Sequence, residues 1–387
     1  MSVRVTVGVS ESFDTVEAFG DAAADAARRL QAPCDLAVVF ASAPHLGRAK
    51  WILSEVHDRL EPAHLIGCGA GGVVGGGREI EEGAGAVVWA LSAPRAEIAT
   101  HHFTVEQVED GFEVEGLPAG GRGLGEGLVL LADPYSFSTE ALLGRLNDDH
   151  PGLPVLGGLA SAAVPGSGSL FRDGDVIGEG AVGCSLAGIG MLPCVSQGAA
   201  PVGPEMTITA AHDNVISELA SRPALERLTE AIAGLDERER ELAREGVMLG
   251  IVIDENQPEY TRGDFLIRPI IGVDQDEGTL ATGERMRPGQ IVRLHVRDAT
   301  VADEDLREAL ATQSDALGVG GAAGALLFTC NGRGSHMFNV GDHDAAALED
   351  TLGVPAGGFF CAGEIGPVGG RNFLHGFTAT MAVFAAE

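Results

Sequence analysis

Hydrophobic residues occur in short runs separated by amphipathic stretches, and their order repeats along the chain. Residues 35–41 (DLAVVFA) form an apolar run typical of a buried strand. Residues 47–60 are predicted to form a helix, because Leu53, Val56 and Leu60 fall on one face. The unit continues with a strand at 64–67, a Gly-rich loop at 68–77 and a strand at 85–91.

The same order occurs twice more. The second copy is predicted as a strand at 127–132, a helix at 139–147 capped by Ser138, a strand at 155–157, a Gly/Ala/Ser loop at 158–168, a hairpin with Asp173-Gly174 at its turn, and a strand at 181–186. The third is predicted as a strand at 325–329, a helix at 344–352, a strand at 358–361, a Gly-rich loop at 362–370 and a strand at 378–384.

Repeated strand-helix-strand order implies right-handed crossovers and a partly parallel sheet. The predicted fold class is α/β, with repeated β-α-β units forming mixed sheets in two related halves. The domain boundary is expected near residue 212, where the second copy ends. This gives domains at 1–212 and 213–387.

Further elements fill the gaps between the copies. They are a helix at 15–30, a helix or helix pair at 223–246, strands at 264–273 and 289–297 joined by a turn-rich segment, and a helix at 303–317 capped by Asp303.

Charge excludes several classes of function. The chain has 387 residues and a net charge of −31. Nucleic acids and anionic membrane surfaces are gripped by clustered Lys and Arg, so neither is an expected partner. The acidity is interpreted as a well-solvated surface. Residues 180–204 carry no charge but are rich in Gly and Pro, and are predicted to form two buried strands and no membrane span.

The cysteines and the first residues indicate a cytoplasmic protein. The six cysteines are far apart and form no C-x-x-C motif. Residues 1–10 alternate like a strand and lack the apolar segment of a secretory signal. Reduced thiols in the cytoplasm are therefore expected.

Enzyme signatures are missing from the sequence. Residues 67–72 (GCGAGG) match a dinucleotide-binding pattern after a strand, but the residues that follow do not favour the helix which that site requires. The sequence contains no nucleophile elbow, no P-loop and no H-E-x-x-H motif. Neither catalytic residues, a cofactor nor a metal is predicted.

Polar residues gather where the strands of the third copy end. Arg333 lies in a turn with Asn331 and Gly334, and Glu364 follows Gly363 after the next strand. If these strands are neighbours, both charged side chains share a crevice at the carboxyl ends, where open α/β sheets bind ligands. The alternative is a structural salt bridge between two turns. A further alternative is that Cys330 is a nucleophile with His336 or His375 as its base, although an apolar strand Cys is more often part of the core.

Four segments together resemble the FIST family, a sensory module with an N-terminal and a C-terminal part. They are 195–228, 264–299, 330–334 (CNGRG) and 358–384. The matching positions are Ser196, Gln197, Gly198, Arg268, Gly272, Asp274, Arg333, Gly334, Gly363, Glu364 and Thr378. The chain departs from the family at Ala199-Ala200, where relatives often have a larger or basic residue.

The resemblance implies a stand-alone sensor of a small molecule, with an amino acid as a possible ligand and a downstream signalling protein as a possible partner. It carries over no catalytic residues, and the oligomeric state is left open. The alternatives are an interaction scaffold without a small ligand and an enzyme using Cys330. The expected ligand-binding residues are Arg333, Glu364, Asn331, Gly334, Gly363, Gln197, Ser196 and Ser161.

Overall fold

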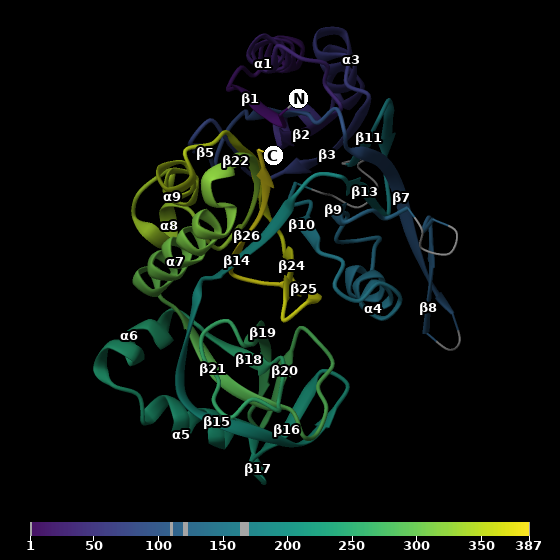
Figure 1. The fold of residues 1–387 in the computed structure, drawn as a ribbon. Coiled ribbons are helices and arrows are strands. Elements are labelled where there is room, and N and C mark those ends of the chain that lie inside the picture. Colours follow the sequence, from purple (N-terminus) through teal and green to yellow (C-terminus); the bar gives the residue numbers. More distant parts are fainter. Residues whose placement is uncertain (1, 109–110, 119–122, 163–169, 387) are drawn as a thin grey trace. The chain divides into compact units, whose positions relative to one another are not determined.

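The chain folds into two compact units, both discontinuous in sequence (Figure 1). A computed structural model describes residues 2–108, 111–118, 123–162 and 170–386. Unit 1 contains Met1–Val195, Leu306–Leu374 and Thr378–Glu387, and unit 2 contains Ser196–Asp305 and His375–Phe377. The compact units therefore differ from a single cut of the chain near residue 212.

Unit 1 holds the three predicted copies. The first is β2 (Leu36–Ser42), α3 (Ala49–Leu60), β3 (His64–Ala70), β4 (Val73–Gly75), β5 (Arg78–Ile80) and β6 (Ala86–Ser92). The second is β9 (Gly127–Ala132), α4 (Thr139–Asp149), β10 (Val155–Leu159), β11 (Leu170–Arg172), β12 (Asp175–Ile177) and β13 (Ala181–Ala187). The third is β22 (Ala322–Cys330), α9 (His343–Leu352), β23 (Ala356–Cys361), β24 (Glu364–Val368), β25 (Arg371–His375) and β26 (Thr378–Ala385).

Other elements flank the copies. They are β1 (Arg4–Ser10), α1 (Thr15–Leu30), α2 (Ala43–Leu46), β7 (Glu97–Val108), β8 (Gly111–Glu115), β14 (Met191–Gln197), α7 (Ala299–Leu317), the short 3-10 helix η2 (Gly318–Gly320) and α8 (Ser335–Phe338). The α/β class with mixed sheets is confirmed. The N-terminal half contributes two copies and the C-terminal half contributes the third.

The three copies exchange their hairpins in a ring. Each copy has a parallel pair, namely β2 with β3, β9 with β10, and β22 with β23. Each hairpin then pairs with a different copy, so that β4 joins β23, β11 joins β3, and β24 joins β10, all antiparallel. Three sheets result, and none is built from one copy alone.

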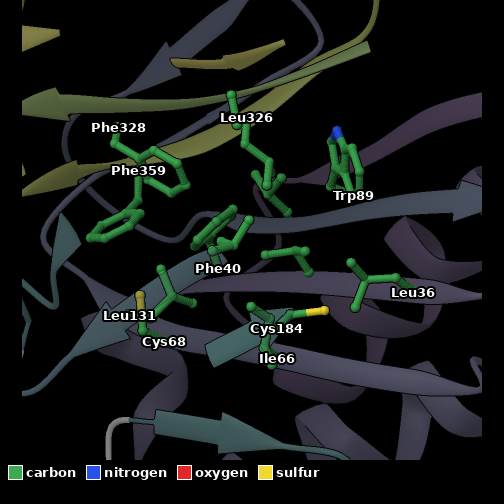
Figure 2. Close-up of a cluster of buried hydrophobic side chains, with 14 of the residues drawn as sticks. Leu36, Phe40, Ile66, Cys68, Trp89, Leu131, Cys184, Leu326, Phe328 and Phe359 are labelled. Atoms are coloured by element: carbon green, nitrogen blue, oxygen red, sulfur yellow. The ribbon is translucent and has the colours of Figure 1, made fainter. Parts of the chain in front are cut away.

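A shared hydrophobic core lies between the three sheets. Figure 2 shows Phe40 and Ile66 of the first copy, Leu131 of the second, and Phe328 and Phe359 of the third in one cluster. The other face of each sheet packs on helices, α1 and α3 for the first, α4 for the second, and α7 and α9 for the third. Because both faces are buried, the central strands are continuous apolar runs without alternation.

One glycine recurs at the same register of each parallel pair. Gly67 pairs with Val39, Gly157 with Leu130, and Gly358 with Leu327. A Cβ atom at any of the three would overlap the carbonyl oxygen of its partner. Gly67 of the GCGAGG motif thus has a packing role. Strand β4, and no helix, follows the motif.

Some predicted boundaries and caps were wrong. The loops expected at 68–77 and 362–370 contain β4 and β24, whose pairing partners lie in other copies. The loop at 158–168 extends into residues 163–169, which lie outside the described residues. Ser138 occupies the N-cap of α4 without a side-chain capping bond. Helix α7 begins at Ala299. The Asp298 carboxylate, and not Asp303, accepts hydrogen bonds from the first backbone N–H groups.

Unit 2 is an antiparallel barrel with two helices. Its elements are β15 (Ala199–His212), β16 (Val215–Leu219), β17 (Arg222–Pro223), α5 (Ala224–Ala233), α6 (Glu237–Glu245), β18 (Val247–Val252), β19 (Phe265–Asp274), β20 (Thr279–Thr282) and β21 (Ile291–Arg297). The order β15-β21-β18-β19-β20-β16 closes because β16 also pairs with β15. A closed sheet leaves no unpaired edge in this ring. The helix pair at 223–246 is confirmed.

The uncharged segment 180–204 forms strands, as predicted. It contains β13, β14 and the beginning of β15. Among the residues that the structure describes, no helix is both long and apolar enough to span a membrane.

Candidate functional site

The loops after the second strand of each copy converge at one place in unit 1. Gly71, Ser161 and Ala362 occupy equivalent positions, four residues after the recurring glycine. The Gly71 N–H donates to Ser161 Oγ at 2.7 Å, and this hydroxyl donates to the Phe360 carbonyl. The Ala362 N–H donates to the Leu159 carbonyl at 3.0 Å. All three copies therefore contribute backbone to one cluster of strand ends.

Asn331 completes this cluster. Its N–H donates to the Cys361 carbonyl at 2.9 Å, and its side-chain oxygen lies near the position that a Cβ on Gly71 would occupy. Gly71, Asn331 and Ala362 are exposed and Ser161 is half-buried. We call these four residues the convergent rim. The backbone N–H groups of Gly71, Asn331 and Ala362 and the Ser161 hydroxyl are bonded within the cluster. The rim therefore presents mainly the Asn331 side chain, at the carboxyl ends of parallel strands, where α/β sheets bind ligands.

Arg333 lies beneath the surface and is 1 % exposed. It forms two hydrogen bonds with Asp344, from Nε to Oδ2 at 2.7 Å and from Nη2 to Oδ1 at 2.8 Å. Thr329 Oγ1 also donates to Asp344 Oδ2, at 2.6 Å. Burial opposes ionisation of Asp344, but the Arg333 guanidinium charge and hydrogen bonds outweigh it and hold the pKa of Asp344 well below its usual range.

The N-terminus of α9 places Asp344 and is capped from another copy. Glu79 of β5 accepts hydrogen bonds from the backbone N–H groups of Asp344 and Ala345 at 2.9 and 3.0 Å. Burial and the neighbouring Asp344 charge raise the pKa of Glu79 to about 7. The exchanged hairpin of the first copy thus fixes the helix that holds the partner of Arg333.

Glu364 is fully buried at the beginning of β24. Its Oε2 accepts hydrogen bonds from Thr378 N and Thr378 Oγ1, at 3.1 and 2.8 Å. Burial raises the pKa of Glu364 to about 8, although the bonds from Thr378 oppose the shift. The carboxyl group is therefore mostly protonated at neutral pH.

The salt bridge between Arg333 and Glu364 was the alternative to a shared crevice, and the ion-pair partner of Arg333 in the structure is Asp344. Arg333 and Glu364 nevertheless lie within electrostatic range of each other, with Cys330 close to both. Arg333 Nη1 and Glu364 Oε1 are buried and lack a nitrogen or oxygen hydrogen-bond partner among the described residues. Buried polar atoms without such a partner are costly to the folded state.

The glycines of the expected set shape the backbone here. Gly334 has φ 87°, and a Cβ there would press on Glu81 and the Phe360 ring. Gly363 is buried, and its carbonyl accepts the Leu159 N–H at 2.8 Å.

Ser196 and Gln197 belong to unit 2. Ser196 Oγ and the Gln197 N–H both donate to Asp305 Oδ2, at 2.8 and 2.7 Å. Gln197 Nε2 donates to the Phe265 carbonyl at 2.8 Å. Both residues are buried, and these contacts hold the beginning of the barrel to β19 and to Asp305.

Sequence patterns missed two residues that shape the site. Asp344 was interpreted only as part of a helix, and Glu79 was assigned to no element. A signal existed for Asp344, because an acidic residue in the first turn of a helix lies near the end of the preceding parallel strand. No comparable signal existed for Glu79, whose partners are more than 250 residues away.

A groove of about 900 Å³ lies elsewhere in unit 1, before the amino ends of β9 and β10. Its polar lining comes from Glu97, Glu126, His150 and Ser185. None of the expected ligand-binding residues lines it. Within the described parts of the chain, no cluster of three or more His, Cys, Asp or Glu side chains is arranged to hold a metal ion.

Comparisons with known proteins match both parts of the chain. The FIST N domain model matches residues 35–222 and the FIST C domain model matches residues 224–367. An uncharacterized protein of Mycobacterium tuberculosis strain H37Rv is 44 % identical over 385 residues, covering 99 % of this chain and all of the relative. An uncharacterized protein of Mycobacterium bovis is 42 % identical over 389 residues, covering both chains in full. The chain belongs to the FIST family, whose domains are small-ligand-binding sensory modules of signal transduction.

Proposed function

We propose that this FIST protein is a cytoplasmic, non-enzymatic sensor that binds an amino acid or a similar metabolite at the convergent rim. The observation that carries the proposal is the meeting of all three copies at Gly71, Ser161 and Ala362. It is supported by Arg333 Nη1 and Glu364 Oε1, which are buried and have no nitrogen or oxygen partner among the described residues. The six free cysteines support a reducing compartment.

The chemistry beneath the rim suits a zwitterion. An amino acid carries a carboxylate and an ammonium group a few ångström apart. Arg333 Nη1 supplies an N–H for the carboxylate while Nε and Nη2 stay on Asp344. Glu364 Oε1 supplies an acceptor for the ammonium. The rim adds the Asn331 amide and backbone groups that approach closely beside Gly71, where no Cβ intervenes.

A proton is expected to leave on binding. Glu364, with a pKa of about 8, is mostly neutral at pH 7. An ammonium group placed against it favours the ionised carboxylate. An amine ligand should therefore release up to about one proton at pH 7. This is measured by calorimetry in buffers of different ionisation enthalpy, and a ligand without an amine should release none.

A sensor must pass its state to a partner, and the ring of copies offers a route. Ligand bound at the rim would contact loops from three sheets at once. Differential binding to two arrangements of these loops would shift their populations. The output is then a change in a surface recognised by a downstream signalling protein.

The proposal is tested by titration calorimetry with the twenty amino acids and common metabolites. At least one should bind the wild-type protein at millimolar concentration or below. Asn331→Ala and Glu364→Gln should each weaken that binding by roughly tenfold or more, because each removes a polar contact to a charged group. Asn256→Ala, an exposed Asn of unit 2, is the matched control and should bind normally.

Two results would contradict the proposal. One is the absence of binding across the whole panel. The other is binding that survives Asn331→Ala and Glu364→Gln but is lost in His150→Ala, which would place the ligand in the groove near β9 instead.

A further inference from the structure

Two thiols face each other in register at the ends of neighbouring strands. Cys330 ends β22 and pairs directly with Cys361, which ends β23. In-register side chains of adjacent strands project from the same face, and their Cα atoms are roughly 4.8 Å apart. A disulfide spans Cα separations of about 4.4–6.8 Å. The two residues are therefore placed to be linked with little movement of the backbone.

The two thiols have different surroundings. Cys330 is half-buried, and the other five cysteines are buried. The Gly332 N–H donates to Cys330 Sγ at 3.3 Å, and the Arg333 guanidinium lies within electrostatic range. Both interactions favour the thiolate, which is the nucleophilic form, whereas a hydrogen bond from the thiol to the Glu364 carboxyl favours the protonated form. Cys361 is fully buried, and burial raises the pKa of its thiol well above the usual value.

We propose that Cys330 and Cys361 form a peroxide-sensitive thiol pair, in which Cys330 is oxidised first and Cys361 resolves it as a disulfide. This inference goes beyond ligand sensing and rests on strand register and thiol environment. Cys330 is half-buried and adjoins the exposed Asn331 of the rim, so a small hydroperoxide would approach it from this side. Cys361 is buried and therefore protected from direct oxidation, and Cys330 is its in-register neighbour on the adjacent strand.

The oxidation of Cys330 and its resolution by Cys361 balance in atoms and electrons. The Cys330 thiolate attacks one peroxide oxygen, the O–O bond breaks, and the leaving hydroxide takes a proton to form water, which leaves a sulfenic acid. The Cys361 sulfur then attacks the sulfenic sulfur. The S–O bond breaks, the thiol proton leaves with the hydroxide as water, and a disulfide remains. One peroxide is reduced to two waters and two thiols are oxidised to one disulfide.

The link would change the candidate site directly. Asn331 of the rim follows Cys330, and its N–H is bonded to the Cys361 carbonyl. A disulfide would tie the ends of β22 and β23 beneath this contact, and Arg333 lies in the same turn. Disulfides in the cytoplasm are usually transient and redox-sensing, which agrees with such a role.

The two cysteines lie in different tryptic peptides, so a disulfide between them can be detected as a cross-linked pair of peptides. Trypsin cleaves after Arg307, Arg333 and Arg371, so Cys330 lies in peptide 308–333 and Cys361 in peptide 334–371. The reduced wild-type protein is treated with hydrogen peroxide, alkylated and digested without reductant. We expect a cross-linked species of these two peptides, lighter by two hydrogen atoms than their sum. Cys361→Ser should instead accumulate a sulfenic acid at Cys330 that dimedone traps, and the control Cys34→Ser should form the disulfide normally.

The wild-type experiment is decisive by itself, so a poorly folded variant does not weaken it. Absence of the cross-link after peroxide treatment would overturn the proposal. So would a cross-link of Cys361 to Cys68, which lies in peptide 60–78 and is within electrostatic range of Cys361. Calorimetry of ligand binding by the reduced protein is a separate readout, so failure of either proposal leaves the other standing.

Discussion

Arg333 and Asp344 form a buried ion pair whose two members depend on each other. Both are at most 1 % exposed. Replacing both by apolar residues of similar size is often neutral, whereas removing one partner leaves an uncompensated buried charge. Arg333→Met should therefore lower the free energy of unfolding by roughly 3–5 kcal/mol, and Arg333→Met with Asp344→Leu should recover most of the loss. Urea denaturation measures the free energy of unfolding of the single and the double variant. Equal losses of stability in these two variants would contradict this account.

Glu364 makes stability depend on pH in a specific window. Burial raises the pKa of Glu364 from its ordinary value of 4.5 to about 8. Glu364 contributes fully to the free energy of unfolding below pH 4.5, where both states are protonated. This contribution is lost as the pH rises towards 8, because the unfolded state has the lower pKa and loses its proton first. Glu364→Gln cannot ionise. Its stability relative to wild type should rise between about pH 5 and 8, by at most about 1.4 kcal/mol per pH unit.

This comparison is made by denaturant unfolding of both proteins across that pH range. Glu79 also titrates near neutral pH, but it is present in both proteins and cancels from the difference. A pH-independent difference would show that Glu364 is ionised throughout.

At the residue scale, the sequence places Arg333 and Glu364 after the neighbouring strands β22 and β23. Their roles required more information. Asp344, the partner of Arg333, was not foreseen, because α9 has apolar residues that explain its helical pattern without reference to Asp344. Neither Ser161 nor Asn331 has a spacing that reveals its contact with another copy. Their placement at the rim follows from strand register across copies, which the order of elements along the chain does not specify.

At the element scale, the recurring glycine governs how each parallel pair packs. Gly358→Ala would place a methyl group against the Leu327 carbonyl, so β22 and β23 would have to separate. The free energy of unfolding should fall by about 3 kcal/mol or more. Gly144→Ala is the matched control, because Gly144 is an exposed glycine of α4 with open space around it. That variant should gain roughly 0.5–1 kcal/mol.

Thermal or urea unfolding measures the stability of the two glycine variants. If Gly358→Ala lost no more stability than a surface substitution, the close approach of β22 and β23 at this glycine would not be needed.

The sequence predicted the strand-helix-strand core of each copy well, because apolar runs and helical periodicity are local signals. It failed at β4 and β24. These short strands are rich in glycine, and they are stabilised by β23 and β10 of other copies. Strand β20 of the barrel was missed for the same reason, since turn residues surround four residues whose partners are β16 and β19.

At the scale of the molecule, the exchange of hairpins makes the copies interdependent. Residues 1–212 contain two copies, but β4 and β10 pair with strands β23 and β24 of the third. Part of the shared core beside Phe40 also comes from the segment after residue 320, which supplies the buried residues Leu326, Phe328, Phe359, Cys361, Ala382 and Phe384. The fragment 1–212 should therefore lack a cooperative unfolding transition and show fluctuating packing by near-ultraviolet circular dichroism. A cooperative transition in this fragment would show that the sequence division near 212 is also a folding unit.

The central claim is that strand ends from all three copies build one ligand site. It is tested most directly from the first copy, whose contribution is Gly71. This glycine has no positive φ, and the three atoms nearest to a Cβ there belong to Ser161 and Asn331 and lie at ordinary contact distances, so a side chain fits the fold but fills the rim. The measurement is calorimetric affinity for the ligand found with the wild-type protein, compared in Gly71→Leu and in Gly174→Leu, an exposed turn glycine with open space around it. We predict that Gly71→Leu abolishes binding and Gly174→Leu retains it. Equal affinity in all three proteins would contradict the claim.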